Sequence, residues 1–79
     1  MSGAAKSALA ERIAEQLAIE TMEVVDASKD DAVIRRVQQT LADQSQTLEE
    51  AFTVAVRVLM AEKRARAVLA RGRAEAGLG

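Results

Sequence analysis

Cysteine, histidine and proline are all absent from this sequence of 79 residues, and Phe52 is its single aromatic residue. Without cysteine, the chain has neither a disulfide framework nor a thiolate metal site to hold its fold. Without histidine, it lacks the usual general base at neutral pH and the commonest ligand of transition metals. We therefore expect a protein that is not an enzyme and that has no cofactor and no bound metal.

Long apolar runs are also missing from the sequence. No stretch approaches the roughly 20 apolar residues that a helix needs to cross a bilayer. The N-terminus lacks the order of basic, apolar and small residues that defines a secretory signal peptide. We therefore expect no membrane span and a location in the cytoplasm.

Hydrophobic residues make up 49% of the sequence, but many of them are small. Seventeen are alanine, which buries little area on folding, and about twenty-two have larger side chains. A chain of this length has room for one domain, residues 1–79. Burial of so few large side chains roughly offsets the conformational entropy lost on folding. We expect association with another chain to supply further burial.

The residues that are present favour helices, because Ala, Leu, Glu, Arg and Gln dominate the sequence. The spacing of apolar residues predicts an all-α fold, a small bundle of three helices over 4–26, 29–43 and 48–73, with flexible ends at 1–3 and 74–79. On the first predicted helix, the residues expected to face the core are Leu9, Ile13, Leu17 and Val24, and Ala10, Ala14, Ala18 and Val25 widen this apolar face. On the second predicted helix, the residues expected to face the core are Val33, Ile34, Val37 and Leu41.

Two breaks separate the predicted helices. Ser28 with Asp31, and Thr47 with Glu50, have the spacing of a capping box, in which the first side chain accepts from the N–H group three residues on. The second break is the weaker prediction, because the 3-4 spacing of apolar residues continues through it without Gly or Pro. The alternative is a single helix over 29–73, and hence a helical hairpin.

The last predicted helix carries apolar residues on two sides, where a surface helix would carry one stripe. We expect the bulkier stripe to face the other two helices; it holds Leu48, Phe52, Ala55, Val56 and Leu59. The second stripe has coiled-coil spacing and small residues, namely Ala51, Val54, Val58, Ala61, Ala65 and Val68. Its centre lies about 125° from that of the first. We interpret it as an oligomer or partner interface, most simply of a twofold homodimer. The alternative is a central helix that uses both sides within one bundle.

Charge is distributed unevenly along the chain, with a balance of −5 over residues 1–62 and +4 over residues 63–79. The basic end consists of Lys63, Arg64, Arg66, Arg71 and Arg73. One hypothesis is contact with an anionic ligand such as nucleic acid. The interpretation we prefer is solvated charge that also complements the negative end of the helix dipole, since no aromatic residue accompanies these cations for stacking on bases.

No metal-binding, phosphate-binding or catalytic motif occurs in the sequence. We predict a protein–protein interaction module, such as a small bacterial regulator, adaptor or assembly subunit, acting through helical surfaces as a homodimer. One alternative is a regulator associated with nucleic acid through the basic C-terminal end. Another is a helical subunit or chaperone of a secretion or filament apparatus, which would fold against its partner.

Overall fold

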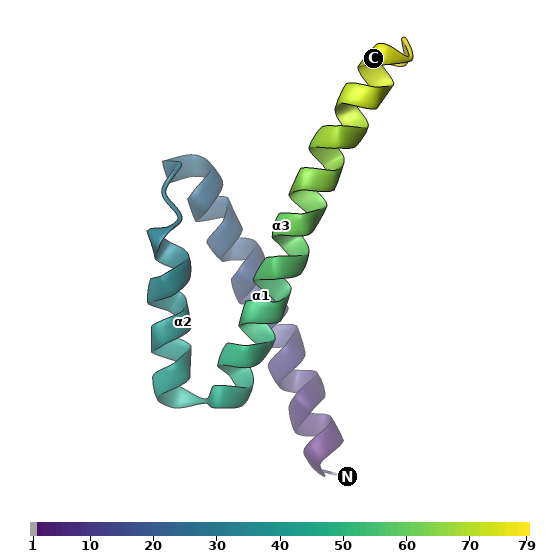
Figure 1. The fold of residues 1–79 in the computed structure, drawn as a ribbon. Helices are drawn as coiled ribbons and strands as arrows, with labels where there is room; N and C mark the ends of the chain where they lie inside the picture. Colours follow the sequence, from purple (N-terminus) through teal and green to yellow (C-terminus); the bar gives the residue numbers. More distant parts are fainter. Residues whose placement is uncertain (1) are drawn as a thin grey trace.

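The computed structural model describes residues 2–79 and contains three helices in that range, with no strand (Figure 1). They are α1 (Ser2–Ser28), α2 (Ala32–Gln44) and α3 (Gln46–Glu75). The predicted all-α fold with three helices is therefore confirmed, and the hairpin alternative is wrong because the chain reverses between α2 and α3. Helix α1 begins at Ser2, before the predicted start at residue 4, and Met1 lies outside the described residues.

The connection from α1 to α2 differs from the predicted capping box. Ser28 is the last residue of α1, and its hydroxyl donates a hydrogen bond to the Val24 carbonyl at 2.7 Å. Lys29 ends the helix because its φ of 60° is left-handed. Helix α2 therefore begins at Ala32, whose N–H group donates to Oδ1 of Asp30 at 2.9 Å. Ser28 is thus not the cap of α2.

The connection from α2 to α3 consists of the single residue Ser45, which has extended backbone angles. Its N–H group donates to the Leu41 carbonyl, and its Oγ accepts from the N–H group of Leu48 at 3.2 Å. Ser45 thus closes one helix and caps the next. The predicted break is confirmed, but the cap is Ser45 and not Thr47.

Helix α3 ends later than predicted, because Gly72 does not stop it. Gly77 adopts a left-handed φ of 77° just after the helix. Its N–H group donates to the Ala74 carbonyl, and the N–H group of Leu78 donates to the Arg73 carbonyl. This is the Schellman arrangement, which satisfies the last carbonyls of a helix with glycine in the left-handed position.

The core is small and built around one aromatic ring. It consists of Ala14, Ala18, Leu41, Phe52 and Val56, with Phe52 fully buried. The predicted core-facing stripe of α3 is confirmed, since Leu48, Ala55 and Leu59 pack against this cluster. On α2 the prediction also holds, with Leu41 buried and the other three apolar residues half-buried.

The prediction for α1 is wrong in part, because the alanines and not the large residues form the buried centre of its face. Ala14 and Ala18 are completely buried, whereas Leu9, Ile13 and Val24 are between 42% and 50% exposed. The physical reason is that small side chains at a crossing point allow two helix axes to approach closely. The bulkier residues are then displaced to the flanks of α1.

The C-terminal part of α3 extends beyond the bundle. Helices α1 and α3 run in the same general direction and cross, and α3 then continues alone to the C-terminus (Figure 1). Every residue from 61 to 79 is exposed. The molecule is accordingly elongated, with extents of 51 × 31 × 13 Å. We call residues 64–75 the arm.

Candidate protein-binding surface

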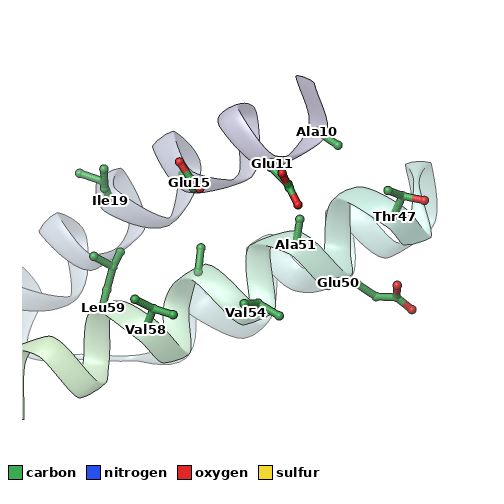
Figure 2. A pocket seen from close by; sticks show the side chains of 11 residues that line it. Ala10, Glu11, Glu15, Ile19, Thr47, Glu50, Ala51, Val54, Val58 and Leu59 are labelled. Carbon is green, nitrogen blue, oxygen red and sulfur yellow. The ribbon is translucent and has the colours of Figure 1, made fainter. Parts of the chain in front are cut away.

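An open groove of about 540 Å³ lies between α1 and α3. Figure 2 shows its two walls, with Ala10, Glu11, Glu15 and Ile19 on α1 and Thr47 to Leu59 on α3. The residues of α3 that line it are Thr47, Glu50, Ala51, Val54, Ala55, Val58 and Leu59. Because α2 contributes no residue to the lining, only two helices bound the groove, and the third side is open to solvent.

Small and β-branched side chains form most of the groove surface. Ile19 is 43% exposed, Val54 58% and Val58 60%, which is high for residues of this type beside a core. Ala51 and Ala55 are half-buried between them. The groove therefore offers a concave apolar surface with few side-chain rotamers to immobilise when another chain packs on it.

The charged residues of the groove are all acidic. Glu11 and Glu15 belong to the α1 wall, and Glu50 belongs to the α3 wall near the N-terminal end of that helix. All three carboxylates are on exposed residues, and no Lys or Arg is among the lining residues. An apolar floor with an acidic rim is complementary to a segment that is apolar on one side and basic on its flanks.

The second predicted stripe of α3 lies on the side of the helix that faces away from the core. At 100° per residue, its members from Val54 to Val68 are about 120° to 180° around the helix from Phe52. Of the six residues predicted as an interface, Ala51, Val54 and Val58 line the groove, and Ala61, Ala65 and Val68 lie exposed beyond it. Val68 is 70% exposed. The stripe is therefore divided between the groove and the helix beyond the bundle.

The opposite flank of α3 is occupied by α2. Nε2 of Gln38 in α2 donates to Oγ1 of Thr53 at 3.1 Å, and the Thr53 hydroxyl donates to Oε2 of Glu49 at 2.9 Å. This chain of hydrogen bonds lies on the side of α3 that α2 contacts. The groove on the other flank is consequently left without a helix to cover it.

Two of the five predicted anion-contacting residues have acidic partners. Lys63 makes an ion pair with Asp26 near the end of α1, and Nε of Arg66 donates to Glu62 at 2.9 Å. The hydrogen bond from Lys63 lowers the pKa of Asp26 below the ordinary value, and the charges of Lys63 and Lys29 act in the same direction. Lys63 is thus engaged with the body of the molecule.

The other three predicted cations, Arg64, Arg71 and Arg73, lie exposed on the arm. No ion pair with an acid is found for these three among the side chains that the structure describes. Arg64 and Arg71 are one heptad apart and share one side of the helix, whereas Arg73 points to a different side. The arm therefore carries positive charge on both flanks of its apolar row.

A second, more polar hollow of about 390 Å³ lies at the junction of α1 and α2. Val25, Asp26, Lys29, Asp30, Asp31 and Lys63 line it. Its acids are balanced in part by the two lysines. Within the described residues, no three His, Cys, Asp or Glu side chains come together as a metal site.

Three groove residues on α1 are not recognisable from the sequence as interface candidates. Ile19 lies outside the apolar stripe predicted for α1, and Glu11 and Glu15 resemble ordinary surface charges of a helix. These three residues line the groove only because of the position that α1 takes along α3. The sequence offers one signal, namely that Glu11, Glu15 and Ile19 follow one another at a spacing of four residues and so share one side of α1.

Comparisons of the chain with protein-family models, with curated proteins and with solved structures gave no match. None of the helices in the described part of the chain has both the length and the apolar character to cross a membrane.

Proposed function

We propose that this chain is a non-catalytic interaction module that forms a homodimer through the exposed apolar side of α3. The observation that carries the proposal is the row of Val54, Val58 and Val68, which are between 58% and 70% exposed on the side of the helix opposite the core. Three valines exposed in one row of a single helix form the kind of apolar patch that marks an interaction site.

The small core also favours association. Among residues 8–79, whose burial the structure describes, five hydrophobic residues are buried, and two of these are alanines. A domain with so little buried apolar surface has a small free energy of unfolding, and binding to a second folded chain increases it by mass action. A regulator, adaptor or assembly subunit acting in the cytoplasm is the biological role that we propose for such a module.

Sedimentation of the full chain with and without Val58→Glu tests this proposal. The wild type is expected to form a dimer, and Val58→Glu is expected to be monomeric because the new carboxylate would be buried in the interface. The matched control is Val24→Glu, since Val24 is 48% exposed on α1 but does not line the groove. A wild type that remains monomeric at the highest attainable concentration would overturn the proposal.

A second function, binding of nucleic acid, is favoured by one observation, the exposed Arg64, Arg71 and Arg73 on the arm. Phosphate contacts by these side chains would make binding strongly dependent on salt. Retention of the wild type on DNA at low salt, lost on simultaneous Arg64→Glu and Arg71→Glu substitution, would support this function. No retention at low salt would exclude it.

A further inference from the structure

We infer that the occupant of the groove between α1 and α3 is the arm of a second copy of this chain, with the two α3 helices antiparallel. This inference rests on the proposed homodimer and specifies its geometry. The groove and the arm are two parts of the described structure that its own fold leaves uncovered, and their surfaces are complementary in length, polarity and charge.

The arm cannot reach the groove of its own chain. Helix α3 is continuous from Gln46 to Glu75, so the arm points along the helix axis away from the groove that residues 47–59 line (Figure 1). Folding back would require breaking the helix and losing its hydrogen bonds. A groove and an arm on the same continuous helix can therefore meet only between two molecules.

The lengths of the arm and the groove agree. The arm spans twelve residues, or about 18 Å at the helical rise of 1.5 Å per residue. On α3 the groove extends over the thirteen residues from Thr47 to Leu59, which is about 20 Å by the same rise. One arm would therefore fill one groove from end to end.

The apolar surfaces also match. Ala65, Val68 and Leu69 form the apolar side of the arm, and Val68 and Leu69 are 70% and 59% exposed. In the groove they would contact Ile19 and the valines of α3. The contact removes large exposed apolar side chains of both surfaces from water, which is favourable in proportion to the apolar area buried.

Charge determines the direction of the pairing. The groove has three carboxylates on Glu11, Glu15 and Glu50, whereas the arm has four arginines and the single acid Glu75. An antiparallel arrangement places each basic arm on the acidic groove of the other copy. A parallel arrangement would place arm against arm and groove against groove, with like charges facing each other.

The antiparallel arrangement is a closed twofold dimer, in which each copy gives one arm and receives one. The centre of the overlap between residues 47–59 and residues 64–75 falls near Ala61. Ala61 is exposed and small, and Val58 and Ala65 are its neighbours on the same side. Small residues at this point allow the two α3 helices to approach closely at the axis.

Charge reversal on each surface tests the inference. The groove variant carries Glu11→Arg and Glu15→Arg, and the arm variant carries Arg64→Glu and Arg71→Glu. All four residues are exposed, so the folded protomer is expected to keep its helicity by circular dichroism. Matched controls are Glu20→Arg with Glu23→Arg on α1 and Arg35→Glu with Arg36→Glu on α2, exposed residues that do not line the groove.

Each reversed variant alone is expected to dimerise at least about tenfold more weakly than the wild type, because the net charges of its arm and its groove have the same sign. Mixing the two variants is expected to restore a dimer of one copy of each, detected by sedimentation with one component carrying a mass tag. The controls are expected to dimerise as the wild type does, and wild-type affinity is expected to fall as salt rises.

Reversed variants that dimerise as well as the wild type would overturn the inference, as would a failure of the mixture to recover the dimer. In either case a wild-type dimer that is lost on Val58→Glu substitution would leave the proposed function intact. A monomeric wild type would remove both. Should a reversed variant unfold, Glu11→Gln with Glu15→Gln replaces it, and unchanged salt dependence of its dimerisation would then overturn the inference.

Discussion

Nζ of Lys63 in α3 makes an ion pair with Oδ1 of Asp26 in α1, 37 residues away in the sequence. The pair joins the end of α1 to the point where α3 leaves the bundle. Beyond Lys63, the arm has no contact that buries a side chain. The pair therefore marks the boundary between the helical bundle and the exposed arm.

The pair predicts a pH dependence. Because the pKa of Asp26 is lower in the folded state than in the unfolded chain, the pair stabilises the fold above the unfolded pKa. This contribution is lost as the pH falls through the folded pKa. Lys63→Met is expected to raise the pKa of Asp26 in an NMR titration of its carboxyl group, and Arg66→Met is expected to leave it unchanged. An equal pKa in the wild type and Lys63→Met would contradict the assignment.

Phe52 is predicted to dominate the stability of the protomer. Its ring is fully buried, and removal of a buried ring by Phe52→Ala costs about 3–5 kcal/mol of the free energy of unfolding. Val54→Ala, two residues away and exposed, is expected to change it by less than about 0.5 kcal/mol at concentrations where the chain is monomeric. Urea denaturation followed by circular dichroism measures both. Similar losses of the free energy of unfolding in the two variants would contradict the position of Phe52 at the centre of the core.

Ser45→Ala is predicted to destabilise the protein by about 1 kcal/mol, because the N–H group of Leu48 loses its side-chain acceptor. The control is Thr47→Ala, which removes the residue that the capping-box pattern favours but leaves the observed cap in place. Thermal unfolding of both variants distinguishes the two. A larger effect at Thr47 than at Ser45 would show that α3 begins at the later position.

Lys29→Gly is predicted to stabilise the protein by about 1 kcal/mol. Lys29 adopts a φ of 60°, where a side chain clashes with the backbone and glycine does not. Lys29→Ala keeps the Cβ atom and is expected to have little effect. Chemical denaturation of the two variants gives the comparison, and equal stabilities of Lys29→Gly and Lys29→Ala would contradict a left-handed end of α1.

Helix positions and the core face of α3 could be predicted from the sequence because both depend on local spacing. Leu48, Phe52, Val56 and Leu59 recur every three or four residues, which is the spacing of one face of a helix. The pattern locates the break between α2 and α3 but indicates the wrong cap, since Ser45 and Thr47 are both good capping residues. The choice depends on where α2 ends: its last residue is Gln44, and the N–H group of Ser45 donates to the Leu41 carbonyl of the last turn.

The core face of α1 could not be predicted in full, because it depends on how closely two helices cross. Spacing favours the large side chains at Leu9 and Ile13, whereas the crossing with α3 uses Ala14 and Ala18. The acidic rim of the groove also depends on how α1 crosses α3, so it could not be predicted from the sequence. Glu11 is part of this rim only because the position of α1 along α3 places Glu11 beside the face of α3 that carries Val54.

The most direct test of the account is a distance measurement between two copies of the full chain. Because the sequence lacks cysteine, Ala74→Cys introduces a unique site for a spin label at an exposed position of the arm. In an antiparallel dimer centred near Ala61, the two labels are separated by about 40 Å, from thirteen residues of helical rise on each side of the axis. A double electron–electron resonance measurement is predicted to give this distance. A separation close to one helix diameter would contradict the antiparallel pairing, and a signal with no defined distance would contradict the dimer itself.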